Sequence, residues 1–382
     1  MLGWIDDMTF LFVFGTRPEA IKLCPLILHL KTKTNVRVCV TGQHKELIEP
    51  ILTLFGIVPD FDLALLQPNQ TLNSFTARCI QDIKKVYEHV KPDCVIVQGD
   101  TTTSMCAALS AFYEKIPVAH VEAGLRTYEL YSPFPEEMNR QIISRIAQYH
   151  FVPTESNKEN LLSERCDPEN IFVTGNTGID ALQWVLKNRV VPVDSIVDIG
   201  NKKLILVTGH RREHFGEPFE RVCYSIKKIA ETMDDVVIVY PVHLNPNVQK
   251  PVNAILSGDD NIKLLPPQAY PEFVSLMAKA SVILTDSGGV QEEAPSLRVP
   301  ILVMRDTTER QESAEHGFSF LVGTDPEKIV TLTTRCLTEE NFYHPVGTNP
   351  YGDGKAVEKI ASVLESKIQS EKVIEPISTE VS

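Results

Sequence analysis

Apolar, β-branched runs alternate with helix-like patterns along most of the chain. In the first half the predicted strands cover residues 9–14, 36–40, 94–98, 118–121, 150–152 and 171–174. Patterns of helical period fall between them, including residues 18–30, 71–89 and 136–147. This alternation is typical of βαβ units that build a mainly parallel sheet.

The pattern lapses at residues 187–202 and then resumes as a second series. The second set of predicted strands covers residues 204–208, 236–240, 262–265, 282–285, 301–303 and 320–322, with helices at 219–232, 271–280 and 328–337. We therefore expect two doubly wound α/β domains, residues 8–186 and 203–350, which face one another across a cleft. Residues 187–202 are the expected linker, and a helix at 354–370 is expected to pack back on the first domain.

Four glycine-containing turns carry most of the candidate chemistry. They are residues 15–19 (GTRPE), 99–103 (GDTTT), 209–213 (GHRRE) and 286–293 (DSGGVQEE). Each follows a predicted strand, at the edge where open α/β sheets bind their ligands.

Composition excludes several classes of protein. The 382 residues carry a net charge of −13, which argues against a nucleic-acid scaffold. The eight cysteines contain no CxxC pair and fall in apolar patterns, as small buried thiols in a reducing compartment would. No apolar stretch approaches the roughly 18 residues of a membrane span, and residues 1–7 are an acidic extension rather than a secretory signal. We expect a cytoplasmic protein with no membrane partner.

The chain lacks the usual fingerprints for cofactors. There is no GxGxxG, no GxxxxGK[ST] and no HExxH, so we expect neither a nicotinamide nor a required metal. A phosphate must therefore be held in another way. Ser287, Gly288 and Gly289 offer a hydroxyl and consecutive N–H groups at a predicted helix start, although the same residues would also suit an ordinary N-cap. Arg17, Lys22 and Arg310 are candidate cations for a pyrophosphate, or else solvated side chains.

Carboxylates and histidines supply the candidate proton chemistry. Asp100 and Glu122 follow strands, and Glu136 begins a helix, so the three could share a site. Asp100 would equally serve as a cap of the helix after it, and Glu136 could simply favour a helix N-terminus. His210 could carry a proton or bind phosphate, or it could be a surface histidine. For His243 a functional role and a structural role fit the sequence equally well.

Several of these segments together resemble one family. Residues 14–22, 98–103, 120–127, 133–140, 207–213, 240–246 and 284–295 resemble the non-hydrolysing UDP-N-acetylglucosamine 2-epimerases, and the match runs from about residue 10 to residue 351. The resemblance implies a GT-B fold of two Rossmann-like domains, usually in a homodimer. It also implies reversible conversion of UDP-GlcNAc to UDP-ManNAc for surface polysaccharide synthesis, without a cofactor. The family mechanism is anti elimination of UDP to 2-acetamidoglucal, followed by re-addition on the other face.

The resemblance assigns roles to individual positions of this chain. The catalytic candidates are Asp100, Glu122, Glu136, Arg140 and His210. The candidate nucleotide contacts are Arg17, Lys22, Gln268, Phe273, Ser287, Gly288, Gly289, Glu293 and Arg310. The positions that match a second, activating UDP-GlcNAc site are Gln43, Gln70, Arg211 and His243. Which carboxylate removes the proton is left open.

Three other functions fit part of the pattern. A GT-B glycosyltransferase would share the fold but would need an acceptor. A 2-epimerase of another UDP-N-acetylhexosamine would differ only in recognition at sugar carbons 4 and 6. A UDP-sugar sensor would bind without turnover, and the full set of candidate acid and base groups argues against it.

Overall fold

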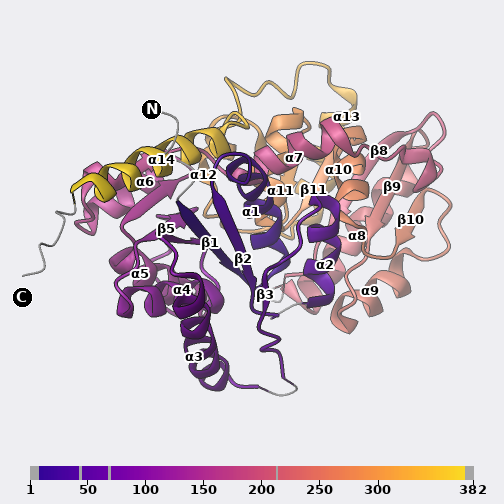
Figure 1. The fold of residues 1–382 in the computed structure, drawn as a ribbon. Helices are drawn as coiled ribbons and strands as arrows, with labels where there is room; N and C mark the ends of the chain where they lie inside the picture. The colour runs from indigo at the N-terminus through magenta and orange to yellow at the C-terminus, as the bar shows by residue number, and fades with distance from the viewer. Residues whose placement is uncertain (1–7, 43–44, 68–69, 212–213, 375–382) are drawn as a thin grey trace, which may run out of the picture. The chain divides into compact units, whose positions relative to one another are not determined.

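The computed structural model describes residues 8–42, 45–67, 70–211 and 214–374. The chain divides into two compact units (Figure 1). One unit comprises Met1–Ala181 with Gly354–Ser382, and the other comprises Leu182–Asp353. The boundary falls inside helix α7, Thr177–Asn188, and the residues 187–202 that were expected as a linker include the short 3₁₀ helix η2, Val193–Ser195.

The first unit is built on a seven-stranded parallel sheet. In chain order its strands are β1 Thr9–Phe14, β2 Asn35–Val40, β3 Phe61–Asp62, β4 Cys94–Gln98, β5 Val118–Val121, β6 Tyr149–Val152 and β7 Ile171–Val173. Their order across the sheet is β3-β2-β1-β4-β5-β6-β7. Phe10, Phe12 and Phe14 alternate with Leu11 and Val13 along β1 and all five are fully buried, because helices cover both faces of the sheet.

Helices of the first unit form two layers. They are α1 Arg17–Leu30, α2 Lys45–Phe55, α3 Leu72–Val90, α4 Thr102–Tyr113, α5 Glu136–Ile146, α6 Glu155–Ser163 and α14 Ala356–Ile374. Helix α4 packs between α3 and α5, and this layer shares a core with Leu11 and Val13 of β1. Helix α1 packs against α2 and against the C-terminal helix α14.

The second unit repeats the design. Its parallel strands are β8 Lys203–Thr208, β9 Val236–Pro241, β10 Ile262–Leu265, β11 Val282–Thr285, β12 Ile301–Val303 and β13 Ser319–Leu321, in the order β10-β9-β8-β11-β12-β13. Its helices are α8 Glu217–Thr232, α9 Pro246–Leu256, α10 Tyr270–Lys279, α11 Gly288–Glu293, α12 Gln311–Glu315 and α13 Pro326–Thr338. Helix α8 packs against α9 and α13 over a single apolar core.

The prediction of two doubly wound, Rossmann-like parallel sheets is confirmed. Twelve of the thirteen strands lie within a residue or two of the predicted positions. The exception is β3, whose two residues make too short an apolar run to give a periodic signal. In each sheet the strand order reverses between neighbours, β1 and β4 in one and β8 and β11 in the other, and the four glycine-containing turns follow these four strands. This is the switch point at which such sheets bind ligands.

A buried glutamate joins the two turns at the first switch point. One oxygen of Glu19 accepts hydrogen bonds from the backbone N–H groups of Gly15 (3.0 Å) and Thr16 (2.7 Å) in the turn after β1. Its other oxygen accepts from the hydroxyls of Thr101 (2.7 Å) and Ser104 (2.9 Å) in the turn after β4. Burial raises the pKa of the Glu19 carboxyl, and the four donors act in the opposite direction. The two turns are therefore held together by one carboxylate.

We predict that Glu19→Ala destabilises the protein by about 3 kcal/mol, because the N–H groups of Gly15 and Thr16 lose their acceptor in a buried place. Glu19→Gln should cost only about 1 kcal/mol, since the amide oxygen can accept both N–H groups while its NH2 group faces hydroxyls that can turn. Urea unfolding followed by circular dichroism measures both. Glu155→Ala, at the exposed first turn of α6, is the matched control and should cost less than about 0.5 kcal/mol. Equal losses at the two positions would contradict the anchoring role.

Candidate active site

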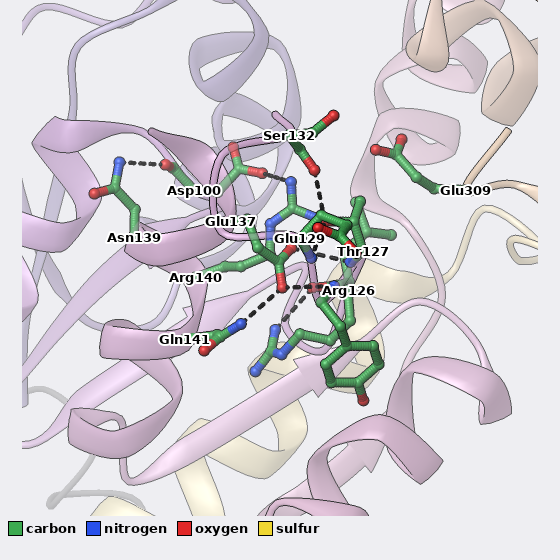
Figure 2. Close-up of polar contacts among 12 residues, drawn as sticks. Asp100, Arg126, Thr127, Glu129, Ser132, Glu137, Asn139, Arg140, Gln141 and Glu309 are labelled. Atoms are coloured by element: carbon green, nitrogen blue, oxygen red, sulfur yellow. Dashed lines mark hydrogen bonds and ion pairs between the residues drawn. The ribbon is translucent and has the colours of Figure 1, made fainter. Parts of the chain in front are cut away.

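Asp100 is held in place by helix α5. Arg140 Nη2 lies 2.8 Å from Asp100 Oδ2, and Asn139 Nδ2 donates to the Asp100 backbone carbonyl at 2.9 Å. Figure 2 shows the two α5 side chains converging on the turn after β4. The Arg140 side chain is 4% exposed and that of Asp100 is 29% exposed, so the carboxylate keeps access to solvent beside a buried guanidinium.

The alternative in which Asp100 caps the following helix is wrong. Thr101 is the N-cap of α4, and its hydroxyl accepts from the N–H of Ser104 at 3.1 Å. The capping function thus falls one residue later than the sequence suggested. Asp100 is left to face Arg140.

Glu122 is fixed by two donors on a single oxygen. Its Oε2 lies 2.5 Å from Lys22 Nζ of α1 and 2.6 Å from Gln98 Nε2 at the end of β4. Its backbone is in the left-handed region, with φ +64°, where a glutamate is uncommon and which is a feature of functional sites. The backbone also passes close to α6, since a Cβ on Gly124 would lie 2.3 Å from the carbonyl oxygen of Asn157. The sharp turn after β5 aims Glu122 at Lys22.

Lys22 is buried, so its reading as a solvated residue is wrong. It stays a predicted nucleotide contact, and the structure also gives it a carboxylate partner, Glu122. Arg17, the first residue of α1, is half-buried at the same switch point.

The two glutamates at the start of α5 differ in environment. Glu136 is the first residue of the helix and is half-buried. Glu137 is fully buried and accepts from Gln141 Nε2 and from the backbone N–H groups of Thr127 and Tyr128, at 2.8 to 3.1 Å (Figure 2). Burial raises the pKa of Glu137, but these hydrogen bonds outweigh it and leave the pKa below its usual value. Glu137 therefore anchors the loop after β5, whereas Glu136 keeps partial exposure to solvent and stays a predicted catalytic residue.

His120, in β5, supports the turn that carries Asp100. Its Nε2 lies 2.7 Å from the carbonyl oxygen of Gly99. Burial lowers the pKa of His120 to about 3, so the imidazole is neutral at physiological pH. Because a carbonyl oxygen only accepts, Nε2 carries the proton. His120 therefore stabilises the turn after β4 through this hydrogen bond.

In the second unit a buried aspartate organises the first turn. Asp286 Oδ2 accepts from the backbone N–H groups of His210 (2.7 Å) and Arg211 (2.8 Å), in the turn after β8. The ring of His210 stacks on that of His243, with centroids 4.9 Å apart and planes 8° apart. The structure thus brings together His210, expected at the catalytic site, and His243, expected at an activating site.

Arg310 lies against the start of α11 and is paired with carboxylates. Its Nε and Nη2 each lie 2.7 Å from Glu292 Oε1, and its Nη1 lies 2.9 Å from Glu309 Oε2. A Cβ on Gly288 would lie 2.6 Å from the guanidinium carbon, so a side chain at this position would displace Arg310. The reading of Arg310 as a solvated side chain is wrong, since it is 9% exposed.

The remaining predicted ligand-binding residues differ in their contacts and burial. Ser287 is the N-cap of α11 but makes no side-chain cap. Glu293 Oε2 accepts from the hydroxyl of Tyr270 at 3.0 Å. Gln268, Phe273, Gln70 and Arg211 are half-buried. Gln43 lies outside the described residues.

Four functional partners were missed from the sequence. They are Gln98, His120, Asn139 and Asp286 in its role beneath His210. All four stand inside the quoted motifs, and Gln98 and His120 are polar residues in otherwise apolar strands. A buried polar residue requires a partner, and that signal could have found both.

The eight cysteines are free, and six of them are buried as predicted. Within the described residues, no group of three or more His, Cys, Asp or Glu side chains is arranged to hold a metal ion. The described helices include none that is both long and apolar enough to cross a membrane.

Comparisons with known proteins agree on one family. A family model described as UDP-N-acetylglucosamine 2-epimerase matches residues 28–365. The UDP-N-acetylglucosamine 2-epimerase of Yersinia pestis is 53% identical over 372 residues, which cover 94% of this chain and 99% of the relative. The crystal structure of UDP-GlcNAc 2-epimerase from Neisseria meningitidis bound to UDP-GlcNAc matches with a TM-score of 0.88 and 46% identity, over 94% of this chain and 100% of that chain. The S. aureus MnaA–UDP structure matches with a TM-score of 0.86 and 40% identity, over 95% of this chain and 97% of that chain.

The two Rossmann-like units have the GT-B architecture of these structures, and the matches extend over nearly the whole chain. The chain therefore belongs to the UDP-N-acetylglucosamine 2-epimerase family of isomerases.

Proposed function

We propose that the protein interconverts UDP-GlcNAc and UDP-ManNAc by inverting sugar carbon 2. Family membership and the UDP-GlcNAc-bound relative support the substrate. The observation that carries the proposal is the pair of carboxylates at the ends of neighbouring strands β4 and β5, Asp100 with Arg140 and Glu122 with Lys22. Inversion at a carbon atom requires one group to take a proton from one face and another to return it from the opposite face.

The reaction is an elimination followed by an addition. A carboxylate removes the proton from carbon 2 while the bond from carbon 1 to the UDP oxygen breaks, and the electron pair forms the double bond of 2-acetamidoglucal. UDP then re-adds at carbon 1 as carbon 2 receives a proton on its other face. Asp100, Glu122 and Glu136 are the candidate acid and base groups. The C–H proton is a poor acid, so the departure of UDP must be assisted as its charge develops.

The departing diphosphate needs hydrogen-bond donors. The amides of the first turn in each unit are occupied, by Glu19 in one and by Asp286 in the other. The donors proposed for UDP are therefore Arg17, His210, Arg310 and the amides of Ser287–Gly289. Arg310 already has carboxylate partners, so it contributes fixed geometry more than net positive charge.

The other nucleotide contacts that we propose are Lys22, Gln268, Phe273 and Glu293. We further propose a homodimer in the cytoplasm, with domains 8–186 and 203–350. A second UDP-GlcNAc bound by Gln43, Gln70, Arg211 and His243 would activate turnover, so that the rate depends cooperatively on substrate.

We expect UDP-GlcNAc incubated with the enzyme in deuterium oxide, without added cofactor or metal, to yield UDP-ManNAc with deuterium at sugar carbon 2. Solvent deuterium enters because the proton removed from carbon 2 exchanges before the addition step. Proton NMR reads both the new isomer and the loss of the carbon 2 proton. Turnover only after addition of an acceptor would indicate a glycosyltransferase. Turnover only with another UDP-N-acetylhexosamine would indicate that this other sugar is the substrate. Binding without turnover would indicate a sensor.

We predict that Asp100→Asn and Glu122→Gln each lower kcat by about 10³-fold, because each removes a group that moves or stabilises a proton in the transition state. The Kd for UDP, measured by calorimetry, should change by less than about threefold, since neither side chain is proposed to contact the nucleotide. Circular dichroism checks that each variant is folded.

The matched control for these two variants is Asp60→Asn. Asp60 also pairs with an arginine at 2.8 Å and accepts a backbone N–H, but it lies beside β2 away from both switch-point turns. Its turnover should stay within about threefold of the unmodified enzyme. If the folded Asp100 and Glu122 variants turn over as fast as the control, neither residue takes part in catalysis.

A further inference from the structure

Asp286 has one oxygen in use and one buried without a partner. The side chain is 2% exposed, and Oδ2 accepts both backbone N–H groups of the turn after β8. Among the described residues, Oδ1 has no hydrogen-bond partner. Burying a carboxylate oxygen without a hydrogen-bond donor destabilises the folded protein, so a donor is expected nearby.

His210 presents a ring nitrogen to that oxygen. Its Nδ1 lies 3.7 Å from Asp286 Oδ1, within ion-pair distance and about 1 Å longer than a charge-assisted hydrogen bond. Because the backbone N–H of His210 is already bound by the same carboxylate, the residue is attached to Asp286 at two points.

His243 restricts the plane of this ring. The two rings are stacked, and His243 Nδ1 accepts from the backbone N–H of Asn245 at 3.1 Å, so that nitrogen carries no proton. Burial lowers the pKa of His243, and the neighbouring His210 lowers it further, while Asp286 acts in the opposite direction. The ring stacked on His210 is thus a neutral imidazole.

We propose that Asp286 is a positioning residue that holds His210 as the Nδ1–H tautomer and turns its Nε2 toward the ligand. In this tautomer Nε2 is the acceptor, so it first takes a proton from water. The resulting imidazolium, stabilised by the Asp286 carboxylate, then donates the Nε2–H in a hydrogen bond to the diphosphate oxygen on which charge develops. This arrangement follows the logic of an Asp–His pair in acyl-transfer enzymes. The catalytic part of the inference rests on the proposed epimerase function, whereas the tautomer does not.

The decisive variant is Asp286→Asn. Its amide oxygen can still accept the two backbone N–H groups, but its NH2 group would face Nδ1 and select the opposite tautomer. We expect kcat to fall by about 10²-fold or more, with the Kd for UDP within about threefold.

The matched control is Asp325→Asn. Asp325 is an exposed N-cap whose Oδ1 also accepts two backbone N–H groups, from Glu327 and Lys328, with no histidine involved. Its turnover should be unchanged. A loss as large as that of Asp286→Asn would show that removing any such turn carboxylate harms the enzyme, and would overturn the proposal.

A double-mutant cycle separates positioning from support of the turn. If Asp286 acts through His210, the Asp286→Asn change should cost less than about threefold in a His210→Asn background. If it only supports the turn, the two losses multiply, and the proposal fails.

Nitrogen-15 NMR of the unmodified, ligand-free enzyme tests the tautomer without any assay. The His210 signals are assigned by their disappearance in His210→Asn, and the shifts of the two ring nitrogens show which one carries the proton. Protonated Nδ1 is the expected result, and protonated Nε2 overturns the proposal even if Asp286→Asn fails to fold. Protonated Nδ1 in a protein that does not epimerise UDP-GlcNAc would leave the Asp286–His210 pair intact and reject the proposed function alone.

Discussion

In each unit a side-chain carboxylate occupies the backbone N–H groups of the first βα turn. Glu19 binds those of Gly15 and Thr16, and Asp286 binds those of His210 and Arg211. In dinucleotide-binding sheets with the same strand order, such amides hold the pyrophosphate. In this protein the N–H groups bind side-chain carboxylates, so a ligand phosphate must bind other donors. Each carboxylate joins the turns after two neighbouring strands, because Glu19 also binds the turn after β4 and Asp286 itself follows β11.

The charges of the candidate site are compensated within each unit. Lys22 faces Glu122, Arg140 faces Asp100, and Arg310 faces two glutamates. A hydrogen bond from Gln98 to the Glu122 carboxylate and one from Asn139 to the backbone carbonyl of Asp100 restrict these two residues further. A substrate that binds such a site meets preformed geometry rather than a broad positive surface. This is consistent with a chain of net charge −13 that recognises an anionic nucleotide sugar.

Much of the fold and the position of the candidate site could be predicted from the sequence. Buried parallel strands are apolar and regularly spaced, so their positions and the turns after them could be predicted. The two-residue strand β3 could not. The partners of the site residues were less accessible. Asp100 read equally well as a helix cap, and only the hydrogen bond from Ser104 to Thr101 separates the two possibilities. Arg310 could be read as a phosphate ligand or as a solvated side chain, and its carboxylate partner Glu292 was not apparent because it stands eighteen residues away on another element.

The sequence by itself determined which turns carry the chemistry, because apolar period and glycine placement are local properties of the chain. It also determined the family, because long motifs in a fixed order are specific. Tertiary structure alone decided the pairings: Lys22 with Glu122 across 100 residues, Glu19 with Ser104 across 85, and Asp286 with the turn of His210 across 76. A parallel sheet brings the ends of distant strands to one edge, so the contacts that set charge and orientation there are between residues far apart in sequence.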